Sequence, residues 1–474
     1  MLGIEVALEH CDRRCIGYFR GEQGLVSACV GSTSHQHRIA LGGACVALLA
    51  VAGAVLQECR AQEIEQYLPI TVPGYDQRGG AVIATRPLTE YDPLGVHVGA
   101  FTVRTQLNEG VLYNDNVLGR SGGPGSWAIG TAPSVSFNSN FARNSIGGSF
   151  SLNDAHYLDQ PAQTRTDYSA SLGGTYQIGS DSVTIAASEL YQHEDPTSID
   201  SRTLQTPLGF HVTDVRVLYD TSFGRWRLEP TAEYLAFRFD DQTLPGDTFR
   251  QKVRDRDAYV GALTTRYEFF PGRSVVFVVR GVQTRYVASL GGAIRPDSTA
   301  YEALAGIDYS VSGNLQVLLL GGYEVRQFQN SALHTISSPV AQAAVIWTPT
   351  GLTTVTAKAA RTIQDAIGET TTGVTTTQGR LVVDHELRRN WLLQAAAGAV
   401  YAEYAQGGGN QTVYSAGTSA TYRVNRNLRV TGSYNFTAIT GTTTQLGFVP
   451  FGAFAVPNSN FNQNLFLLQV GLAL

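Results

Sequence analysis

Six histidines lie beyond residue 61, and they are the side chains best suited to catalysis or metal binding. They are isolated from one another and show no metal-ligand spacing: His97, His156, His193, His211, His334 and His385. His156 follows Asn153 and Asp154 and is the best candidate for a lipase-like site, but no nucleophile elbow accompanies it. We therefore expect no catalytic residue, no metal and no cofactor, and we predict that the protein is not an enzyme.

Two other stretches carry residues that could bind a phosphate or a cation. The glycines of GRSGGPG (119–125) would suit a phosphate loop only between a strand and a helix, and here a strand is expected on either side. Asp115 in YNDNV could ligate calcium at a rim, but turn formation at a strand end explains Asn-Asp-Asn equally well. We interpret both stretches as loop residues.

The strongest functional signal is a set of charged residues that alternates with apolar ones. In TDVRVLYDTSF, Asp214, Arg216 and Asp220 fall on one side of a strand, because successive side chains point to opposite faces. The same alternation elsewhere gives candidate channel-lining residues of both signs: Asp167, Asp214, Arg216, Asp220, Glu229, Glu233, Arg266, Glu268, Glu302, Asp308, Glu324, Arg326, Asp384, Glu386, Arg423 and Arg429. These charges either pair into a network that stiffens a wall, or line a water-filled path that is no strong ion filter.

The composition suits strands that would position such side chains. A chain of 474 residues with Gly 50, Tyr 22 and Phe 20, one Met and 15% charged residues favours strands, tight turns and aromatic girdles over helices. The net charge of −5 and the mean hydropathy of −0.07 do not by themselves indicate a membrane. A membrane barrel is compatible with this mean hydropathy, because each apolar lipid-facing residue of a strand is balanced by a polar residue that faces the lumen. A soluble sandwich shows the same alternation, so the pattern alone does not separate the two folds.

Turn spacing separates the two folds better. Longer polar segments, such as 240–257 and 441–460, alternate with short turns, and this asymmetry is typical of outer-membrane barrels. The eight short turn signals are 139–144, 178–181, 223–226, 269–273, 311–314, 349–352, 387–391 and 424–427. Eight such turns join nine hairpins. They predict an all-β fold, a transmembrane antiparallel up-and-down β-barrel of about 18 strands over 96–474, with 16 strands as the alternative.

One predicted strand does not fit the template. RSVVFVVRGVQTRYV (273–287) is apolar on both faces and places Arg280 on the wrong one, which leaves its register open.

The chain ends on an apolar strand, NLFLLQVGLAL. One face carries Phe466, Leu468, Val470, Leu472 and Leu474, and the other carries Leu467, Gln469, Gly471 and Ala473. In a soluble sheet this strand would be a sticky edge, which native proteins avoid. We expect it to close the ring with its first face toward lipid, and to act as the assembly-signal strand.

The N-terminal region is typical of an exported protein. In the order expected of a signal peptide, HQHR (35–38) would be the positively charged region, residues 39–56 the apolar region and residues 59–61 the cleavage site with small residues. All five cysteines precede Gln62. The alternative is a transmembrane helix. We predict that 1–61 is a signal peptide with an upstream extension that need not be translated. Residues 62–95 are predicted to form an extended periplasmic segment, and both ends of the mature chain to lie in the periplasm.

TRPLTEYDPLGVHVGAFTVRTQLNEGVLYNDNV (85–117) resembles the opening of the putative β-barrel porin 2 family of Gram-negative bacteria. The resemblance lies in Arg86-Pro87, in YDPLG (91–95), in GAF (99–101) and in YNDNV (113–117). It implies a barrel in the cell outer membrane. Some members look like barrels encoded with exopolysaccharide synthesis and export machinery, and the family offers no catalytic residues to transfer. The aromatic residue that usually ends such a strand is replaced here by Leu474.

These observations predict a polar passage, with export of a secreted exopolysaccharide as the first hypothesis. The alternatives are a general diffusion porin for small polar solutes and a closed structural barrel. A plugged transporter is disfavoured, because the predicted segment 62–95 is too short for a plug domain. The expected partners are outer-membrane lipid and lipopolysaccharide, the barrel-assembly machinery, periplasmic polysaccharide-export proteins and a polysaccharide, with no nucleic acid.

Overall fold

The computed structural model describes residues 19–21, 24–26, 68–69, 72–75, 82–199, 206–244, 247–249, 251–288, 295–365, 373–405, 408–441, 444–449, 452–457 and 460–474. The chain divides into two compact units, residues 1–41 and 42–474. In the first unit, β1 (Phe19–Gly21) pairs antiparallel with β2 (Gly24–Val26). The predicted segments at 35–61 lie outside the described residues, so the cleavage site stays a prediction.

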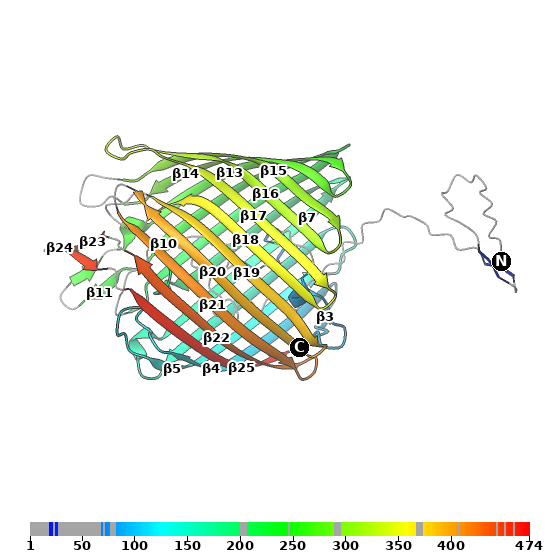
Figure 1. Cartoon of the computed structure of the whole chain (residues 1–474), viewed down its shortest axis with the longest axis horizontal. Coiled ribbons are helices and arrows are strands. Elements are labelled where there is room, and N and C mark those ends of the chain that lie inside the picture. Colours follow the sequence, from blue (N-terminus) through cyan, green and yellow to red (C-terminus); the bar gives the residue numbers. More distant parts are fainter. Residues whose placement is uncertain are drawn as a thin grey trace. The chain divides into compact units, whose positions relative to one another are not determined.

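In the second unit, 18 long antiparallel strands close into one barrel (Figure 1). They are β4 (Phe101–Asn114), β5 (Ser126–Ser139), β6 (Ser145–Tyr157), β7 (Arg165–Ile178), β8 (Asp181–His193), β9 (Gly209–Phe223), β10 (Trp226–Phe239), β13 (Arg256–Phe270), β14 (Arg273–Tyr286), β15 (Ser298–Ser312), β16 (Leu315–Phe328), β17 (Ile336–Thr350), β18 (Thr353–Gln364), β19 (Val374–Arg388), β20 (Trp391–Tyr404), β21 (Asn410–Arg423), β22 (Leu428–Gly441) and β25 (Phe461–Ala473). Each long strand pairs with the next along the chain, and β25 pairs with β4 to complete the ring. The prediction of an 18-stranded barrel is confirmed.

Short turns and long connections lie at opposite rims, which we call the turn rim and the loop rim. All eight predicted turns join strands at the turn rim, and in the two-residue turns Gly224 and Gly272 adopt φ of 59° and 70°. Positive φ is what a tight hairpin requires and what glycine adopts without strain. The short β3 (Val96–Val98) pairs with the first residues of β4 at this rim.

The longer connections lie at the loop rim, and two of them carry small hairpins. The first is β11 (Gln242–Leu244) with β12 (Asp247–Phe249), and the second is β23 (Thr444–Val449) with β24 (Gly452–Pro457). Single 3-10 turns occur at η2 (Ile83–Thr85), η3 (Pro161–Gln163) and η4 (Lys252–Arg254). No described helix has the length and apolar character to cross a membrane.

The two faces of each strand differ as the alternation predicts. On β25, Leu468 is 61% exposed on the outer face whereas its neighbour Gln469 is 4% exposed on the inner face. Phe466, Val470, Leu472 and Leu474 share the outer face with Leu468. An outer surface of exposed aliphatic and aromatic residues suits contact with lipid.

The structure gives the register of β14, which the sequence left open. Arg280 faces the interior together with Val276 and Val278, while Phe277 and Val279 face outward. The strand is apolar on both faces because its inner valines pack in a cluster on the inner wall, together with residues of three neighbouring strands: Leu304, Leu320 and Val340. Arg280 therefore lies on the inner face of the wall, where it lines the cavity.

Candidate functional site

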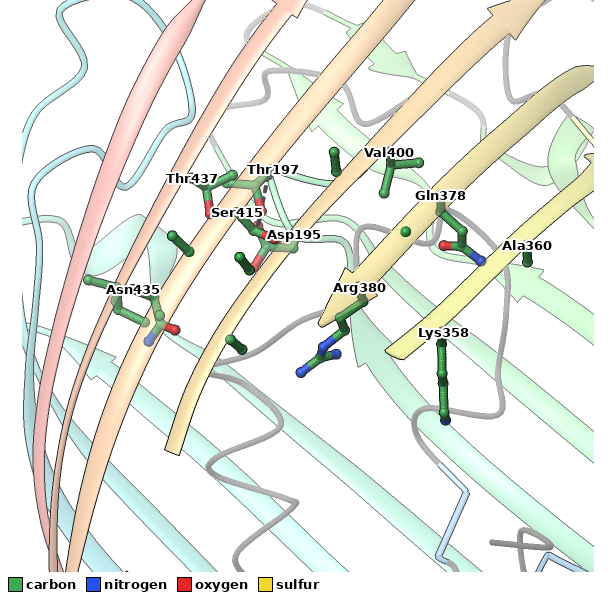
Figure 2. Close-up of a pocket in the computed structure, with 18 of the residues that line it drawn as sticks. Asp195, Thr197, Lys358, Ala360, Gln378, Arg380, Val400, Ser415, Asn435 and Thr437 are labelled. Carbon is green, nitrogen blue, oxygen red and sulfur yellow. Dashed lines mark hydrogen bonds between the residues drawn. The ribbon is translucent and has the colours of Figure 1, made fainter. Parts of the chain in front are cut away.

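A cavity of about 690 Å³ lies inside the barrel, and Figure 2 shows part of its lining. Inward-facing residues of most of the strands surround it, among them the small side chains of Ala396, Gly398, Ser415 and Gly417 on β20 and β21. Because these side chains are short, they leave space between the wall and the barrel axis. The cavity is the candidate functional site.

Carboxamide side chains form much of the neutral polar lining of this cavity. They come from widely separated strands of the ring: Asn108, Asn114, Asn153, Gln342, Gln378, Asn435, Gln463 and Gln469. A carboxamide has two donor hydrogens and an acceptor oxygen, so such a lining can bond hydroxyl groups in either sense. The alternation in the sequence contained this signal, but only charged residues were selected from it.

Charged residues of both signs also line the cavity. The cations are Arg165, Arg216, Arg280, Lys358 and Arg380, and the carboxylates that face the interior are Asp195 and Glu233. Arg216 Nη2 lies 2.5 Å from Glu233 Oε1, and Arg280 Nη1 lies 3.1 Å from Glu302 Oε2. Lys358 and Arg380 are direct cross-strand neighbours on β18 and β19, and Figure 2 shows both side chains extending into the cavity.

All sixteen predicted channel-lining residues occupy inward positions of their strands, but only Arg216 and Glu233 line the cavity. The others form the wall around it or lie toward the rims: Asp167, Asp214, Asp220, Glu229, Arg266, Glu268, Glu302, Asp308, Glu324, Arg326, Asp384, Glu386, Arg423 and Arg429. Many of them form ion pairs or hydrogen bonds along the wall instead of extending toward the axis. Opposite charges on adjacent strands are close enough to do so.

One such network follows β9, β10, β13 and β15. Arg227 bonds Asp220 and lies 3.0 Å from Glu229 Oε1, while Arg266 bonds Glu229 and lies 3.7 Å from Asp308 Oδ2. These lateral pairs correspond to the wall-stiffening alternative that the sequence left open. Sequence reasoning missed Arg227, although it shares a face with Glu229 in the alternation.

A second network lies on β16 and the connection that follows β18. Arg326 bonds Asp365 and lies 3.5 Å from Glu324, and both Arg326 and Glu324 are buried. At the loop rim, His193 Nδ1 lies 2.7 Å from Asp167 Oδ1. These contacts stabilise the inner wall without reaching the cavity.

The catalytic grouping considered for His156 is not assembled. Asn153 lines the cavity, whereas His156 is exposed on the outward-facing positions of β6. Within the described residues, no group of three or more His, Cys, Asp or Glu side chains could hold a metal ion.

The N-terminal segment contributes to the inside of the barrel. The sequence predicted that residues 62–95 extend into the periplasm, but Leu68, Val72 and Tyr75 pack against inward residues of β8, β9 and β10. Their partners include Leu190, Val212 and Phe237. Burial raises the pKa of the Tyr75 phenol, so this side chain stays neutral. The prediction was wrong for these residues because the proline-containing segment has no periodicity that would indicate which wall it contacts.

The connection between β8 and β9 also turns inward at the loop rim. Asp195 and Thr197 line the cavity, and the Asp195 carboxylate accepts hydrogen bonds from the Thr197 N–H at 2.8 Å and from its hydroxyl at 2.7 Å. Ile199 is buried in a cluster on the far wall that includes Val413, Ile439 and Phe461. This connection, which we call the constriction loop (described residues 194–199), therefore narrows the loop-rim side of the bore.

The solved structures that resemble this chain share little sequence identity with it. A search of curated proteins finds no match to the chain. Among solved structures, the outer membrane protein OpdK from Pseudomonas aeruginosa is 13% identical with a TM-score of 0.39, and the match covers 78% of this chain and 99% of that one. The FrpB iron transporter from Neisseria meningitidis is 11% identical with a TM-score of 0.42, covering 78% and 82% of the two chains. The copper transporter OprC is 10% identical with a TM-score of 0.41, covering 80% and 81%.

A family model described as putative beta-barrel porin 2 matches residues 88–448, which is most of the chain. The match includes nearly the whole barrel and begins within the run at 85–117 on which the resemblance was noted. The protein is thus a β-barrel of the Gram-negative outer membrane, and the chain belongs to the putative beta-barrel porin 2 family.

Proposed function

We propose that this barrel is the outer-membrane passage through which a secreted exopolysaccharide leaves the cell. The observation that supports this most directly is the carboxamide lining of the cavity, which includes Asn108, Gln342 and Asn435. A glycan presents many hydroxyl groups that both donate and accept hydrogen bonds, and carboxamides complement both roles.

The charges of the lining agree with a largely neutral cargo. Arg216 is paired with Glu233 and Arg280 with Glu302, so part of the charge is compensated within the wall. Selectivity in pores depends on width and on the polar groups that line them. A mixed lining of this kind favours hydroxyl-rich solutes over a single class of ion.

The proposed partners follow from the two rims and the outer face. The exposed apolar residues of strands such as β25 would contact membrane lipid and lipopolysaccharide. Outer-membrane barrels place their short turns in the periplasm, so the turn rim would receive the polymer from periplasmic export proteins. The strand of Phe466, Leu468, Val470, Leu472 and Leu474 would be recognised by the barrel-assembly machinery.

Two alternatives each have an observation in their favour. A general diffusion porin for small polar solutes would use the same polar lining. A closed structural barrel is favoured by the N-terminal residues and the constriction loop, which both occupy the bore.

A deletion strain and planar-bilayer conductance of the purified barrel test the proposal together. Loss of surface polysaccharide with growth intact, and its restoration by the wild-type gene, is the expected result. Unchanged polysaccharide with a large and weakly selective conductance would support the diffusion porin. Unchanged polysaccharide with no conductance would support the structural barrel.

A further inference from the structure

The described residues 68–69, 72–75 and 82–86 form an N-terminal strap that contacts two opposite walls of the barrel. We propose that this strap sets the exclusion limit of the passage, and that its release from the wall widens the bore. The proposal deepens the proposed function, on which its physiological meaning rests, by naming the element that decides which solutes are small enough to pass.

The first anchor is an apolar contact on the wall of β8, β9 and β10. Val72 is 1% exposed, and Leu68 and Tyr75 are buried with it in one cluster with Leu190 and Val212. The Arg216 guanidinium lies 5.4 Å from the centre of the Tyr75 ring and donates to the Gly74 carbonyl at 3.4 Å. Since Arg216 also lines the cavity, this anchor lies beside the open part of the bore.

The wall is shaped to receive this part of the strap. A Cβ atom at Gly173 would lie 2.0 Å from the Pro73 carbonyl oxygen and 2.9 Å from Val72 Cγ1, and one at Gly147 would lie 3.0 Å from Pro73 Cδ. In the strap itself, Gly74 has φ of 96°. Close approach of two backbones requires glycine, so β6 and β7 supply a groove that matches the strap.

The second anchor lies on β18 and β19. The Ile83 N–H donates to Thr354 Oγ1 at 3.0 Å, and Arg86 bonds Glu386 Oε2 at 2.5 Å and the Gly351 carbonyl at 2.9 Å. Seven strands separate β8 from β18 along one side of the ring and nine along the other. The two anchors therefore lie on nearly opposite walls, and the described strap residues at each anchor take up part of the cross-section of the bore.

Two features make the strap releasable. At the first anchor it helps to bury Asp214, which is 0% exposed and lies 3.9 Å from Arg216. Burial of such a carboxylate costs free energy that water would recover on release. At the second anchor Arg86 is 36% exposed although Glu386 is 2% exposed, so water reaches the guanidinium side of the ion pair and can compete for it.

Adjacent glycines on β7 provide a matched pair of variants. Gly173→Ala adds a methyl group against the strap, whereas Gly174→Ala adds it on the other face, where the nearest atom is the Ser145 carbonyl oxygen at 3.2 Å. The readouts are single-channel conductance of the full-length barrel and permeation of uncharged polyethylene glycols of graded size. We expect a several-fold higher conductance and a larger size limit for Gly173→Ala, and wild-type values for Gly174→Ala.

Two further variants keep the test decisive if Gly173→Ala fails to assemble. Arg86→Gln weakens the second anchor and should also raise conductance. Asp214→Asn removes the buried charge and should lower the conductance, because the docked strap then covers a neutral group. Correct assembly of each variant is verified by heat-modifiable migration.

Wild-type conductance and size limit in assembled Gly173→Ala and Arg86→Gln would overturn the proposal, and so would an absence of conductance in all variants. A wider bore in these variants together with unchanged surface polysaccharide in the deletion strain would keep the strap as the size-limiting element. In that case the export function would be rejected.

Discussion

Asp115 accepts two hydrogen bonds from Asn464, one from its backbone N–H and one from its side-chain amide, each at 2.6 Å. Asp115 directly follows β4 and Asn464 lies in β25, so the pair joins the first and last long strands near the loop rim. Asn116 supports the junction by donating to the Asn462 carbonyl at 3.0 Å. YNDNV thus has a strand-end role, and it connects the two ends of the barrel.

Asp115→Ala should weaken this seam. It removes both bonds and leaves the Asn464 donors without their acceptor, which costs about 1–3 kcal/mol of stability. The temperature at which the heat-modifiable band converts to the unfolded form should fall. Glu403→Ala is the control, because Glu403 is exposed on β20 and forms no ion pair in the described part of the chain. Equal conversion temperatures for both variants would show that the pair does not hold the ring closed.

The strand number, the turn positions and the faces of β25 were predictable because their signals are local. A turn such as 223–226 needs Gly224 at positive φ. The alternation from Phe466 to Leu474 determines which side chains of β25 point outward, because only one of its two faces can contact lipid. These features depend on neighbours in the sequence, so a single chain without alignment is enough to identify them.

The contents of the bore were not predictable in the same way. The register around Arg280 stayed open because the valines that share its face pack inside the barrel, which the sequence of one strand does not indicate. The contact of Val72 with Leu190 joins residues far apart in the chain, and only the glycines at 147 and 173 hint at it. The sixteen selected charges occupy inward positions, but their lateral pairing depends on the register between strands.

A charge on the lipid face of the last strand should impair assembly. Leu468→Arg places a cation at an outward position near the middle of β25, where such a substitution costs about 2–4 kcal/mol. Asn462→Arg is the matched control, since it adds the same charge to the same strand near the loop rim, where the cost is lower. Assembled protein in outer-membrane fractions should decrease strongly for the first variant only. Equal amounts of both would contradict the outward orientation of this face.

The cross-strand pair Lys358 and Arg380 should influence ion selectivity. Both side chains line the cavity, and two positive charges within a few ångströms of a passing ion each contribute about 1 kcal/mol even in water. Replacing both with Gln should lower the chloride-to-potassium permeability ratio several-fold, measured as the reversal potential across a salt gradient. Arg361→Gln removes a charge from the opposite face of β18, where Arg361 bonds Thr377, and should leave the ratio unchanged. An unaltered ratio in the double variant would mean that ions do not pass this pair.

The constriction loop should act as a second resistance in series with the strap. Ile199→Asn places a polar group in the cluster with Val413 and Phe461, where an unpaired amide is costly, so the loop should leave the wall. Conductance should then rise, because Asp195 and Thr197 no longer narrow the cavity. Ser198→Ala, which keeps the backbone bond from residue 198 to the Asp195 carbonyl, is the control and should conduct like the wild type.

Since resistances in series add, Ile199→Asn combined with Gly173→Ala should raise conductance more than either change does alone. If the double variant conducts no better than Gly173→Ala, the loop does not limit the passage and the strap is the dominant restriction.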